Sequence, residues 1–339
     1  MSAPNPHLTI ESRAVGALTG LAVGDALGMP TQSMPRERIV ARHPRLAGFE
    51  PGPPDQPIAP GMPAGSVTDD TEQALLLGQL LVEGQGHVDG HRLARALLAW
   101  ENDMRRRGSL DLLGPSTRAA VAAVAAGRPL EEAGRFGTTN GAAMRIAPVG
   151  IAVPATDLDR LVDRVVEASW VTHNTGVALA GAAAVAAAVS AGLDGADTAT
   201  ATATAVRAAR LAAGRGHWIA AGDIATRIGW ATELVAGRTP EQAADLIYRL
   251  VGTSVATQES VPAAFAVLAV HPDDPWQACL FAAGLGGDTD TIAAMVGAIA
   301  GAGHGVDSFP SGARETIEKV NDLPLAELAT RLLTLRQRS

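Results

Sequence analysis

Two short stretches of the sequence combine acidic and hydroxyl side chains at the expected start of an apolar helix. The first, Gly284–Thr291, reads Gly-Leu-Gly-Gly-Asp-Thr-Asp-Thr and precedes an apolar run. We expect this helix to begin near Thr289. The side chains of Asp288 and Thr291 then share a face, and Asp290 projects about 100° away from Thr291. These groups can surround one cation, or they can serve only as N-terminal caps of the helix.

A second stretch, Gly65–Glu72, has the same character. It reads Gly-Ser-Val-Thr-Asp-Asp-Thr-Glu and leads into an apolar segment with helical spacing. Beside Thr68, the adjacent carboxylates of Asp69 and Asp70 repel each other unless a cation or a strong dipole lies between them. Two such helix starts in one chain favour a binding site over simple capping. Because the ligands are oxygens, without Cys or His, the predicted ion is Mg²⁺, Mn²⁺ or Ca²⁺ rather than Zn²⁺.

A glycine- and hydroxyl-rich segment, Phe136–Pro148, is the candidate for anion binding. The backbone N–H groups of such a turn can cradle an anion, and the arginine that follows is a candidate counter-charge. A plain turn with a salt-bridging arginine fits the same residues. The candidate substrate-binding residues of this segment are Thr138, Thr139, Asn140, Gly141 and Arg145.

A histidine is a further candidate for substrate binding. His173 lies in Trp170–Thr175, which we expect to cap the Ala-rich helix 176–190. Its imidazole can bind substrate or orient a neighbouring group. A structural role at the start of a helix is the alternative, and the sequence leaves both open.

The composition narrows the class of function. The chain has 339 residues, 47% of them hydrophobic, which is enough for a substantial core. The formal net charge is −8 and no Lys/Arg cluster is interleaved with aromatic residues, so we do not expect nucleic acid as the main partner. The lone cysteine, Cys279, permits no internal disulfide, and its apolar surroundings predict a buried, unreactive thiol.

Neither secretion nor a membrane partner is expected. Residues 1–12 lack the basic and apolar regions of a signal peptide. The apolar segments 177–189 and 292–303 are too short to span a bilayer and are rich in Ala and Gly, so we interpret them as buried helices. We therefore expect a cytoplasmic protein, and the sequence makes no prediction of its oligomeric state.

Apolar residues at helical spacing dominate the chain. We predict an all-α fold, a compact single-domain helical bundle, because no sustained period-two run appears. We expect a flexible N-terminus at 1–11 and the folded domain at 12–335. The Pro- and Gly-rich stretch 44–63 is predicted to be a long loop that lines or covers a site, while the Ala/Thr alternation 197–205 fits either a strand or a helix. Predicted helices cover 12–27, 71–83, 91–104, 116–126, 158–168 and 176–190.

Five motifs occur in order along the chain. They are Gly24-Asp25 with Gly28, Gly65–Thr71, Asn140–Arg145, Thr172-His173 and Gly286–Thr291. Each motif is ordinary alone, whereas the ordered set, which covers roughly residues 12–305, is specific. Taken together they resemble the ADP-ribosylglycohydrolase family, which includes the dinitrogenase-reductase-activating and the ADP-ribosyl-arginine and ADP-ribosyl-serine hydrolases.

The resemblance implies a helical domain with a cleft that holds two Mg²⁺ ions, or Mn²⁺ in their place. Members of the family hydrolyse an N- or O-glycosidic bond at C1 of an ADP-ribosyl group. The ions would orient the sugar and lower the pKa of a bound water, whose proton a nearby carboxylate would accept. Carried over position by position, the metal ligands would be Thr68, Asp69, Asp70, Asp288, Asp290 and Thr291.

The chain departs at two places from the pattern of the family that it resembles. Gln32 stands where several members, the serine-directed ones in particular, have a glutamate, and glutamine can hydrogen-bond a water but cannot act as a base. The catalytic candidates are therefore Gln32, as a positioning group, and Asp69 or Asp70, as the proton acceptor. Thr138-Thr139 stand where some relatives have a tyrosine and a glycine. With one tyrosine and five phenylalanines in the chain, little aromatic surface is available to stack on adenine.

Three functions fit these residues. The leading hypothesis is a two-Mg²⁺ hydrolase that removes ADP-ribose from a protein or a small acceptor. The second is the same chemistry on a smaller N-riboside, a nucleoside-like metabolite. The third is a catalytically silent family member that binds ADP-ribose or a partner protein. All six ligand positions are kept, which argues against the third because a binder need not keep a carboxylate cluster, while Gln32 argues for it.

Overall fold

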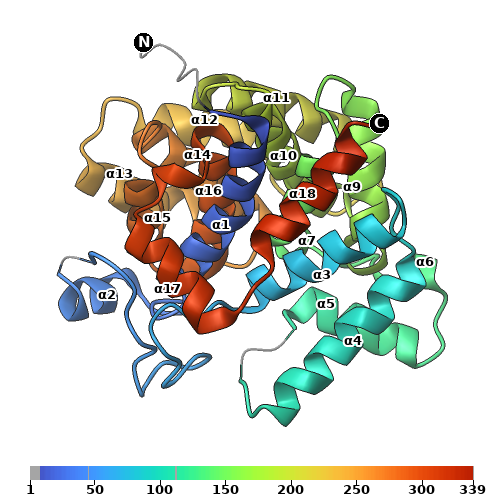
Figure 1. The fold of residues 1–339 in the computed structure, drawn as a ribbon, viewed down its shortest axis with the longest axis horizontal. Helices are drawn as coiled ribbons and strands as arrows, with labels where there is room; N and C mark the ends of the chain where they lie inside the picture. Colours follow the sequence, from blue (N-terminus) through green and yellow to red (C-terminus); the bar gives the residue numbers. More distant parts are fainter. Residues whose placement is uncertain (1–7, 45, 111–112, 339) are drawn as a thin grey trace.

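The protein is described by a computed structural model that covers residues 8–44, 46–110 and 113–338. Across these residues the regular structure is helical and no β-strand forms, which confirms the predicted all-α fold (Figure 1). Pairing of the strand type is limited there to three isolated bridges, Met34–Gly287, Thr139–Ala256 and Thr175–His217. The first two of these bridges fix loops that carry predicted site residues.

The helices follow one another along the whole described chain. In the first half they are α1 (Ile10–Gly28), α2 (Arg36–Arg42), α3 (Asp69–Glu83), α4 (Gly90–Arg106), α5 (Pro115–Ala125), α6 (Leu130–Ala133), α7 (Gly141–Met144), α8 (Ala147–Ala152) and α9 (Leu158–His173). In the second half they are α10 (Gly176–Leu193), α11 (Thr198–Ala212), α12 (Ile224–Val235), α13 (Pro240–Leu246), the π-helix η1 (Ile247–Val251), α14 (Thr257–Val270), α15 (Pro275–Ala283), α16 (Thr289–His304), the 3₁₀ turn η2 (Val306–Ser308), α17 (Ser311–Asn321) and α18 (Leu325–Arg336).

Glycines let α1 and α16 lie in direct backbone contact. Gly20, Gly24 and Gly28 recur every four residues and so share one face of α1. A Cβ atom added at Gly24 would overlap the carbonyl oxygen of Ala293, and one added at Gly28 would overlap the backbone of Asp290. The two helices run antiparallel, so the C-terminal end of α1 lies against the first turn of α16. This contact brings the turn that follows α1 and the start of α16 together at the predicted site.

The Ala-rich helix α10 lies in the core. By length and composition it is the one helix in the described chain that could cross a membrane, yet all of its apolar window is buried inside the protein. A helix that is apolar on every side requires such burial among other helices. The expectation that 177–189 forms a buried helix is confirmed.

One predicted boundary and one open assignment are decided by the structure. Helix α1 begins at Ile10, earlier than the predicted start at Ser12, because the hydroxyl of Thr9 caps it by accepting the Ser12 N–H. Of the predicted flexible N-terminus, 1–11, residues 10 and 11 belong to α1, and residues 1–7 lie outside the described residues. The alternation 197–205 is helical, within α11, and not a strand.

His173 is the last residue of α9 and does not begin the next helix, contrary to the prediction. Helix α9 continues past its predicted end at Ala168 because its last turn is buried in the core. The expectation that the segment Trp170–Thr175 caps α10 is confirmed through Thr175, whose hydroxyl accepts a hydrogen bond from the backbone N–H of Ala178 (3.4 Å).

Candidate active site

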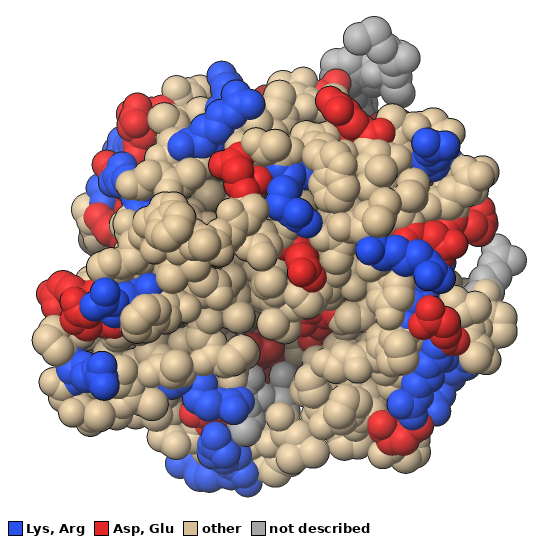
Figure 2. Space-filling model, turned by 180° about the vertical axis from the view of Figure 1, so that it is seen from behind, with Lys and Arg blue, Asp and Glu red and all other residues tan. Residues whose placement is uncertain are grey.

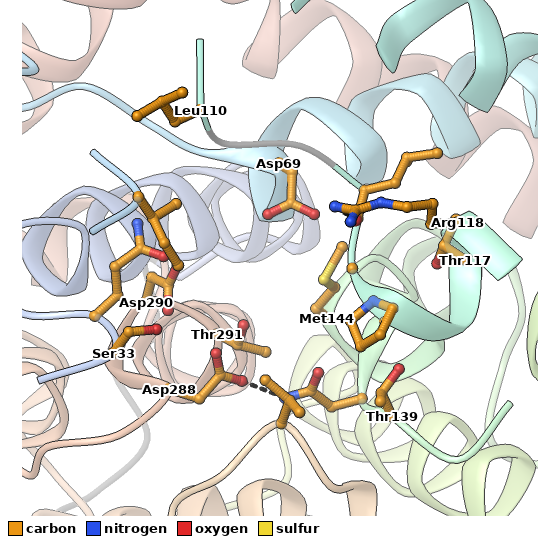
Figure 3. Close-up of a pocket in the computed structure, with 18 residues that line it drawn as sticks. Ser33, Asp69, Leu110, Thr117, Arg118, Thr139, Met144, Asp288, Asp290 and Thr291 are labelled. Atoms are coloured by element: carbon orange, nitrogen blue, oxygen red, sulfur yellow. Dashed lines mark hydrogen bonds between the residues drawn. The ribbon is translucent and has the colours of Figure 1, made fainter. Parts of the chain in front are cut away.

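The two acidic stretches and the glycine-rich segment meet at one cavity of about 290 Å³. Asp69, from the first turn of α3, lines it together with Asp288, Asp290 and Thr291 from the start of α16 (Figure 3). Figure 2 shows acidic side chains deep in a hollow on this face of the molecule. The fold thus gathers groups from distant parts of the sequence around one space.

Asp25 fixes the start of α3. Its carboxylate is fully buried and accepts hydrogen bonds from the backbone N–H and the hydroxyl of Thr68 (2.9 and 2.7 Å). It also accepts from the backbone N–H and the hydroxyl of Thr71 (3.1 and 2.5 Å). Hydrogen bonds to an ionised carboxylate are among the strong ones, so this turn is held in one orientation. Asp25 therefore positions Asp69 and Asp70, which stand between the two threonines.

The start of α16 is fixed by three neighbours. The backbone N–H of Asp288 donates to the carbonyl of Thr253 (2.7 Å), and its carboxylate accepts from Asn140 Nδ2 (2.6 Å) (Figure 3). Further along the same turn, Thr291 Oγ1 donates to Asp70 Oδ2 (3.3 Å). This last hydrogen bond joins the two acidic helix starts directly.

Crowding and burial raise the pKa of several of these carboxyl groups. Burial raises the pKa of Asp70 well above its usual value, and the neighbouring charges of Asp290 and Asp69 raise it further. Burial also raises the pKa of Asp288, and it raises that of Asp25 to about 6 against the opposing effect of the threonine hydrogen bonds. A divalent cation among these groups would favour their ionised form.

The oxygen donors of the site fit a hard divalent cation. Asp70 Oδ1 is buried and has no hydrogen-bond donor among the described residues, so a cation would satisfy it. No group of three or more Asp, Glu, His or Cys side chains in the described chain is arranged to hold an ion by itself. Mg²⁺, however, keeps several waters and commonly uses only one or two protein carboxylates. The set of donors therefore suits Mg²⁺ or Mn²⁺ better than Zn²⁺.

Gln32 lies at the cavity, in the turn that follows α1. Only 3% of it is exposed. Its backbone carbonyl accepts from Gln56 Nε2 (3.2 Å), while its own Nε2 has no acceptor among the described residues. This amide is thus placed to hydrogen-bond a ligand. Ile58 lines the same cavity, so the long loop 44–63 contributes to its wall.

The glycine-rich segment forms another wall of the cavity. Thr139, Asn140 and Gly141 line it. Thr138 does not line it. Its carbonyl accepts from the backbone N–H and the hydroxyl of Thr257 (3.2 and 2.9 Å), which fastens the segment to α14. Thr138 is therefore an anchor of this wall and not a part of its surface.

Arg145 does not face the cavity, contrary to the prediction that it offers a counter-charge to an anion. It is fully buried, and its guanidinium group donates to Gln73 Oε1 (3.2 Å) and Thr172 Oγ1 (2.6 Å). Gln73 Nε2 in turn donates to Asp69 Oδ2 (2.7 Å). Burial lowers the pKa of Arg145 to about 10, against the opposing charge of Asp69, so the group stays charged at neutral pH. Arg145 supports Asp69 from beneath, through Gln73.

His173 also lies beneath the wall and does not line the cavity. It is fully buried, with Nδ1 hydrogen-bonded to Thr172 Oγ1 (2.8 Å) and Nε2 to Thr139 Oγ1 (3.2 Å). A Cβ atom added at Gly141 would lie only 3.0 Å from the imidazole Cε1, so the ring packs against this backbone. Burial and the charge of Arg145 lower the pKa of His173 well below its usual value. The histidine is thus a neutral support for the glycine-rich segment.

The start of α5 is a part of the site that the sequence did not reveal. Gly114, Thr117 and Arg118 line the cavity. The sequence predicts only a helix over 116–126, without assigning it a function. The one available signal is a positive charge in the first turn of a helix that is otherwise rich in alanine, and such a residue is usually a solvated surface group.

Known proteins resemble this chain over nearly its whole length. The sequence profile of the ADP-ribosylglycohydrolase family matches residues 6–339. The uncharacterized protein YegU of Escherichia coli (strain K12) is 36% identical over 326 residues, covering 96% of this chain and 97% of that protein. The ADP-ribosylarginine hydrolase Tri1 of Pseudomonas putida (strain GB-1) is 33% identical over 319 residues, covering 91% of this chain and 74% of that protein. A solved structure described as an ADP-ribosylglycohydrolase-related protein complex matches with a TM-score of 0.70 and 26% identity, over 96% and 98% of the two chains.

The chain therefore belongs to the ADP-ribosylglycohydrolase family. The helical fold of the solved relative and the fold described above agree. The protein is accordingly an enzyme, a glycoside hydrolase of this family, and the family is metal-dependent. Membership of this family supports ADP-ribosyl hydrolase activity of the protein in general.

Proposed function

We propose that this enzyme uses two Mg²⁺ ions, or Mn²⁺ in their place, to hydrolyse the bond at ribose C1 of an ADP-ribosylated protein or small acceptor. One observation carries the proposal. The two acidic helix starts converge on one cavity and are joined by the hydrogen bond from Thr291 to Asp70 (3.3 Å). The name of the Pseudomonas putida relative, an ADP-ribosylarginine hydrolase, supports a substrate of this class.

Each residue of the site has a separate role in this proposed reaction. When bound, the ions supply positive charge that polarises the ribose hydroxyls and the attacking water. Asp69 lines the cavity and is oriented by Gln73, so we assign it the acceptance of a proton from water. Gln32 orients the sugar or the water through its amide. The residues that would hold the ions are Thr68, Asp69, Asp70, Asp288, Asp290 and Thr291.

A smaller riboside is the second candidate substrate. No Phe, Tyr or Trp occurs among the described residues that line the cavity, so they offer no aromatic face for an adenine. A volume of about 290 Å³ lies near the low end of the range for ligand pockets. Both observations favour the ribose end of a substrate as the part that is enclosed. A nucleoside-like N-riboside carries this ribose without the diphosphate and the adenosine of an ADP-ribosyl group.

A metal-supplemented activity screen tests the proposal. The protein would be incubated with ADP-ribosyl-arginine and ADP-ribosyl-serine peptides and with a nucleoside panel, each in Mg²⁺, Mn²⁺ or chelator. Metal-dependent release of ADP-ribose supports the proposal, and Asp288→Asn serves as the inactive control. Turnover of nucleosides alone would establish the second candidate. Binding of ADP-ribose without any turnover would identify a silent family member.

We further propose that the enzyme acts in the cytoplasm. The only cysteine among the described residues, Cys279, is buried and free, and burial raises the pKa of its thiol. A chain without disulfides suits a reducing compartment. Fractionation of cells that express the tagged protein would test the location, and recovery in a membrane or secreted fraction would refute it.

A further inference from the structure

Arg118 is the only Lys or Arg among the described residues that line the cavity. It stands in the first turn of α5, and in Figure 3 its side chain points into the cavity on the side of Asp69. The other charged residues in the described lining are the carboxylates of Asp69, Asp288 and Asp290. The cavity is thus acidic at the starts of α3 and α16 and basic at the start of α5.

Two contacts orient Arg118 and leave some of its N–H donors available for a ligand. Its Nη2 donates to the carbonyl of Leu113 (2.7 Å), and its Nε lies 3.7 Å from Oε1 of Glu101. The side chain remains 55% exposed, and a guanidinium group has five N–H donors. Arg118 can therefore bind a ligand while these contacts hold it at the wall.

The first turn of α5 and the glycine-rich segment form one continuous wall. The backbone N–H of Thr139 donates to Ser116 Oγ (3.4 Å). A Cβ atom added at Gly141 would lie 3.3 Å from Thr117 Oγ1, which shows how closely the two elements approach. Arg118 thus stands beside the backbone of the glycine-rich segment, and both line the same space.

We propose that Arg118 binds a phosphate group of the substrate. The inference rests on the proposed function, in which the ribose carries a diphosphate. Carboxylates at the starts of α3 and α16 repel a phosphate, whereas a planar guanidinium group can bind two phosphate oxygens at once. Arg145 cannot take this role because it is fully buried beneath the wall. Arg118 therefore selects ribosides that carry a phosphate over plain ribosides.

Titration calorimetry on the full chain tests the inference. The ligands are ADP-ribose, ribose 5-phosphate and ribose, each in Mg²⁺ and in chelator, with wild type, Arg118→Gln and Arg118→Lys. Arg210→Gln, at an exposed arginine of α11, is the matched control. We expect Arg118→Gln to weaken both phosphate ligands about tenfold and to leave ribose binding within about twofold of wild type. Arg118→Lys should fall in between, because it keeps the charge but not the fork.

The other possible results either overturn the role of Arg118 or refute the proposed function. Equal losses of affinity for ribose and for ribose 5-phosphate in Arg118→Gln would show that Arg118 only supports the wall. Unchanged affinity for the phosphate ligands with slower turnover of a protein substrate would show that Arg118 contacts the acceptor protein. Either result overturns the inference. A wild type that binds neither phosphate ligand overturns it as well. Arg118-dependent binding of ribose 5-phosphate by a protein that hydrolyses no ADP-ribosyl substrate keeps the inference and refutes the proposed function. Melting curves of each variant separate lost contacts from unfolding.

Discussion

Thr291 and Asp70 are 221 positions apart in the sequence, and the hydroxyl of the first donates to the carboxylate of the second across 3.3 Å. The bond connects the first turns of α3 and α16, which carry the carboxylates of the site. Because Asp25 already fixes α3 and Asn140 already fixes Asp288, neither turn has to move to meet the other. These hydrogen bonds hold the acidic groups in one arrangement, which reduces the cost of ordering them when an ion binds.

Mg²⁺ is expected to stabilise the fold. Ions that bind only the folded state raise its stability by mass action, by about 2.7 kcal/mol at a hundredfold excess over Kd. Asp290→Asn should abolish that gain and leave the metal-free protein no less stable, because the change removes a charge that repels Asp70. The measurement is the melting temperature in Mg²⁺, Mn²⁺ and chelator. A wild-type melting curve that is indifferent to all three would rule out the two-metal proposal.

Asp25→Asn should lower both stability and metal affinity. The amide nitrogen would face the hydroxyl and N–H donors of Thr68 or Thr71, so at least one buried donor loses its acceptor, at a cost of about 1–3 kcal/mol. Urea unfolding measures the stability, and a Mg²⁺ titration of the melting temperature measures the affinity. Thr71→Ser keeps the hydroxyl and is the matched control. Unchanged Mg²⁺ affinity in Asp25→Asn would show that Asp25 does not position the ligands.

Gly24→Ala should be strongly destabilising. The new methyl group would overlap the carbonyl oxygen of Ala293 and push α1 away from α16, and overpacking of this kind costs about 1–3 kcal/mol or more. Gly303→Ala, in the last turn of α16, is the control, because no atom lies within 4 Å of a Cβ added there. That change should be neutral or slightly stabilising. Urea unfolding of both variants measures their free energies of unfolding. Equal values would contradict the close contact of α1 with α16.

Much of the site could be predicted because its chemistry is local in the sequence. The acidic residues at the starts of α3 and α16 follow glycines and precede apolar runs, and acidic and hydroxyl residues before an apolar run are typical of a helix start. The helical class follows in the same way, from the spacing of apolar residues. These features depend on residues only a few positions apart in the sequence, so they can be recognised without the structure.

The roles of the two arginines could not be predicted, because they depend on which helices pack together. Arg145 belongs to the glycine-rich segment in the sequence, but α3 and α9 cover it with Gln73 and Thr172. Arg118 lies in an Ala-rich helix without a functional motif, and only the packing of α5 against the segment turns it to the cavity. The predicted position of His173 at the start of a helix is wrong for the same reason, because burial in the core extends α9 beyond its predicted end.

His173 should make the protein less stable in weak acid. Burial and the charge of Arg145 lower its folded pKa, so below about pH 6.5 the unfolded chain binds a proton that the folded protein does not. Stability is therefore lost as the pH falls from about 6.5 toward the folded pKa, by at most about 1.4 kcal/mol per pH unit. The test compares the pH dependence of urea unfolding in wild type and His173→Gln, so that effects of the carboxylates cancel. Parallel curves between pH 6.5 and the onset of acid unfolding would contradict a neutral buried imidazole.

Gln32→Glu is expected to change turnover, because Gln32 lines the cavity and its Nε2 has no acceptor among the described residues. A carboxylate at this position adds a general base, and such groups contribute about 10² to 10⁴-fold in rate. It also adds negative charge near Asp69 and Asp290, so the affinity for Mg²⁺ should change as well. We predict faster hydrolysis if the wild type is a weakened ADP-ribosyl hydrolase, and slower hydrolysis if the amide is suited to another riboside. Single-turnover hydrolysis of ADP-ribosyl-serine and of a nucleoside panel at saturating Mg²⁺ measures this, with Gln32→Ala as the control that removes the amide without adding charge. If all three proteins behave alike on every substrate that is turned over, Gln32 contacts neither the sugar nor the water.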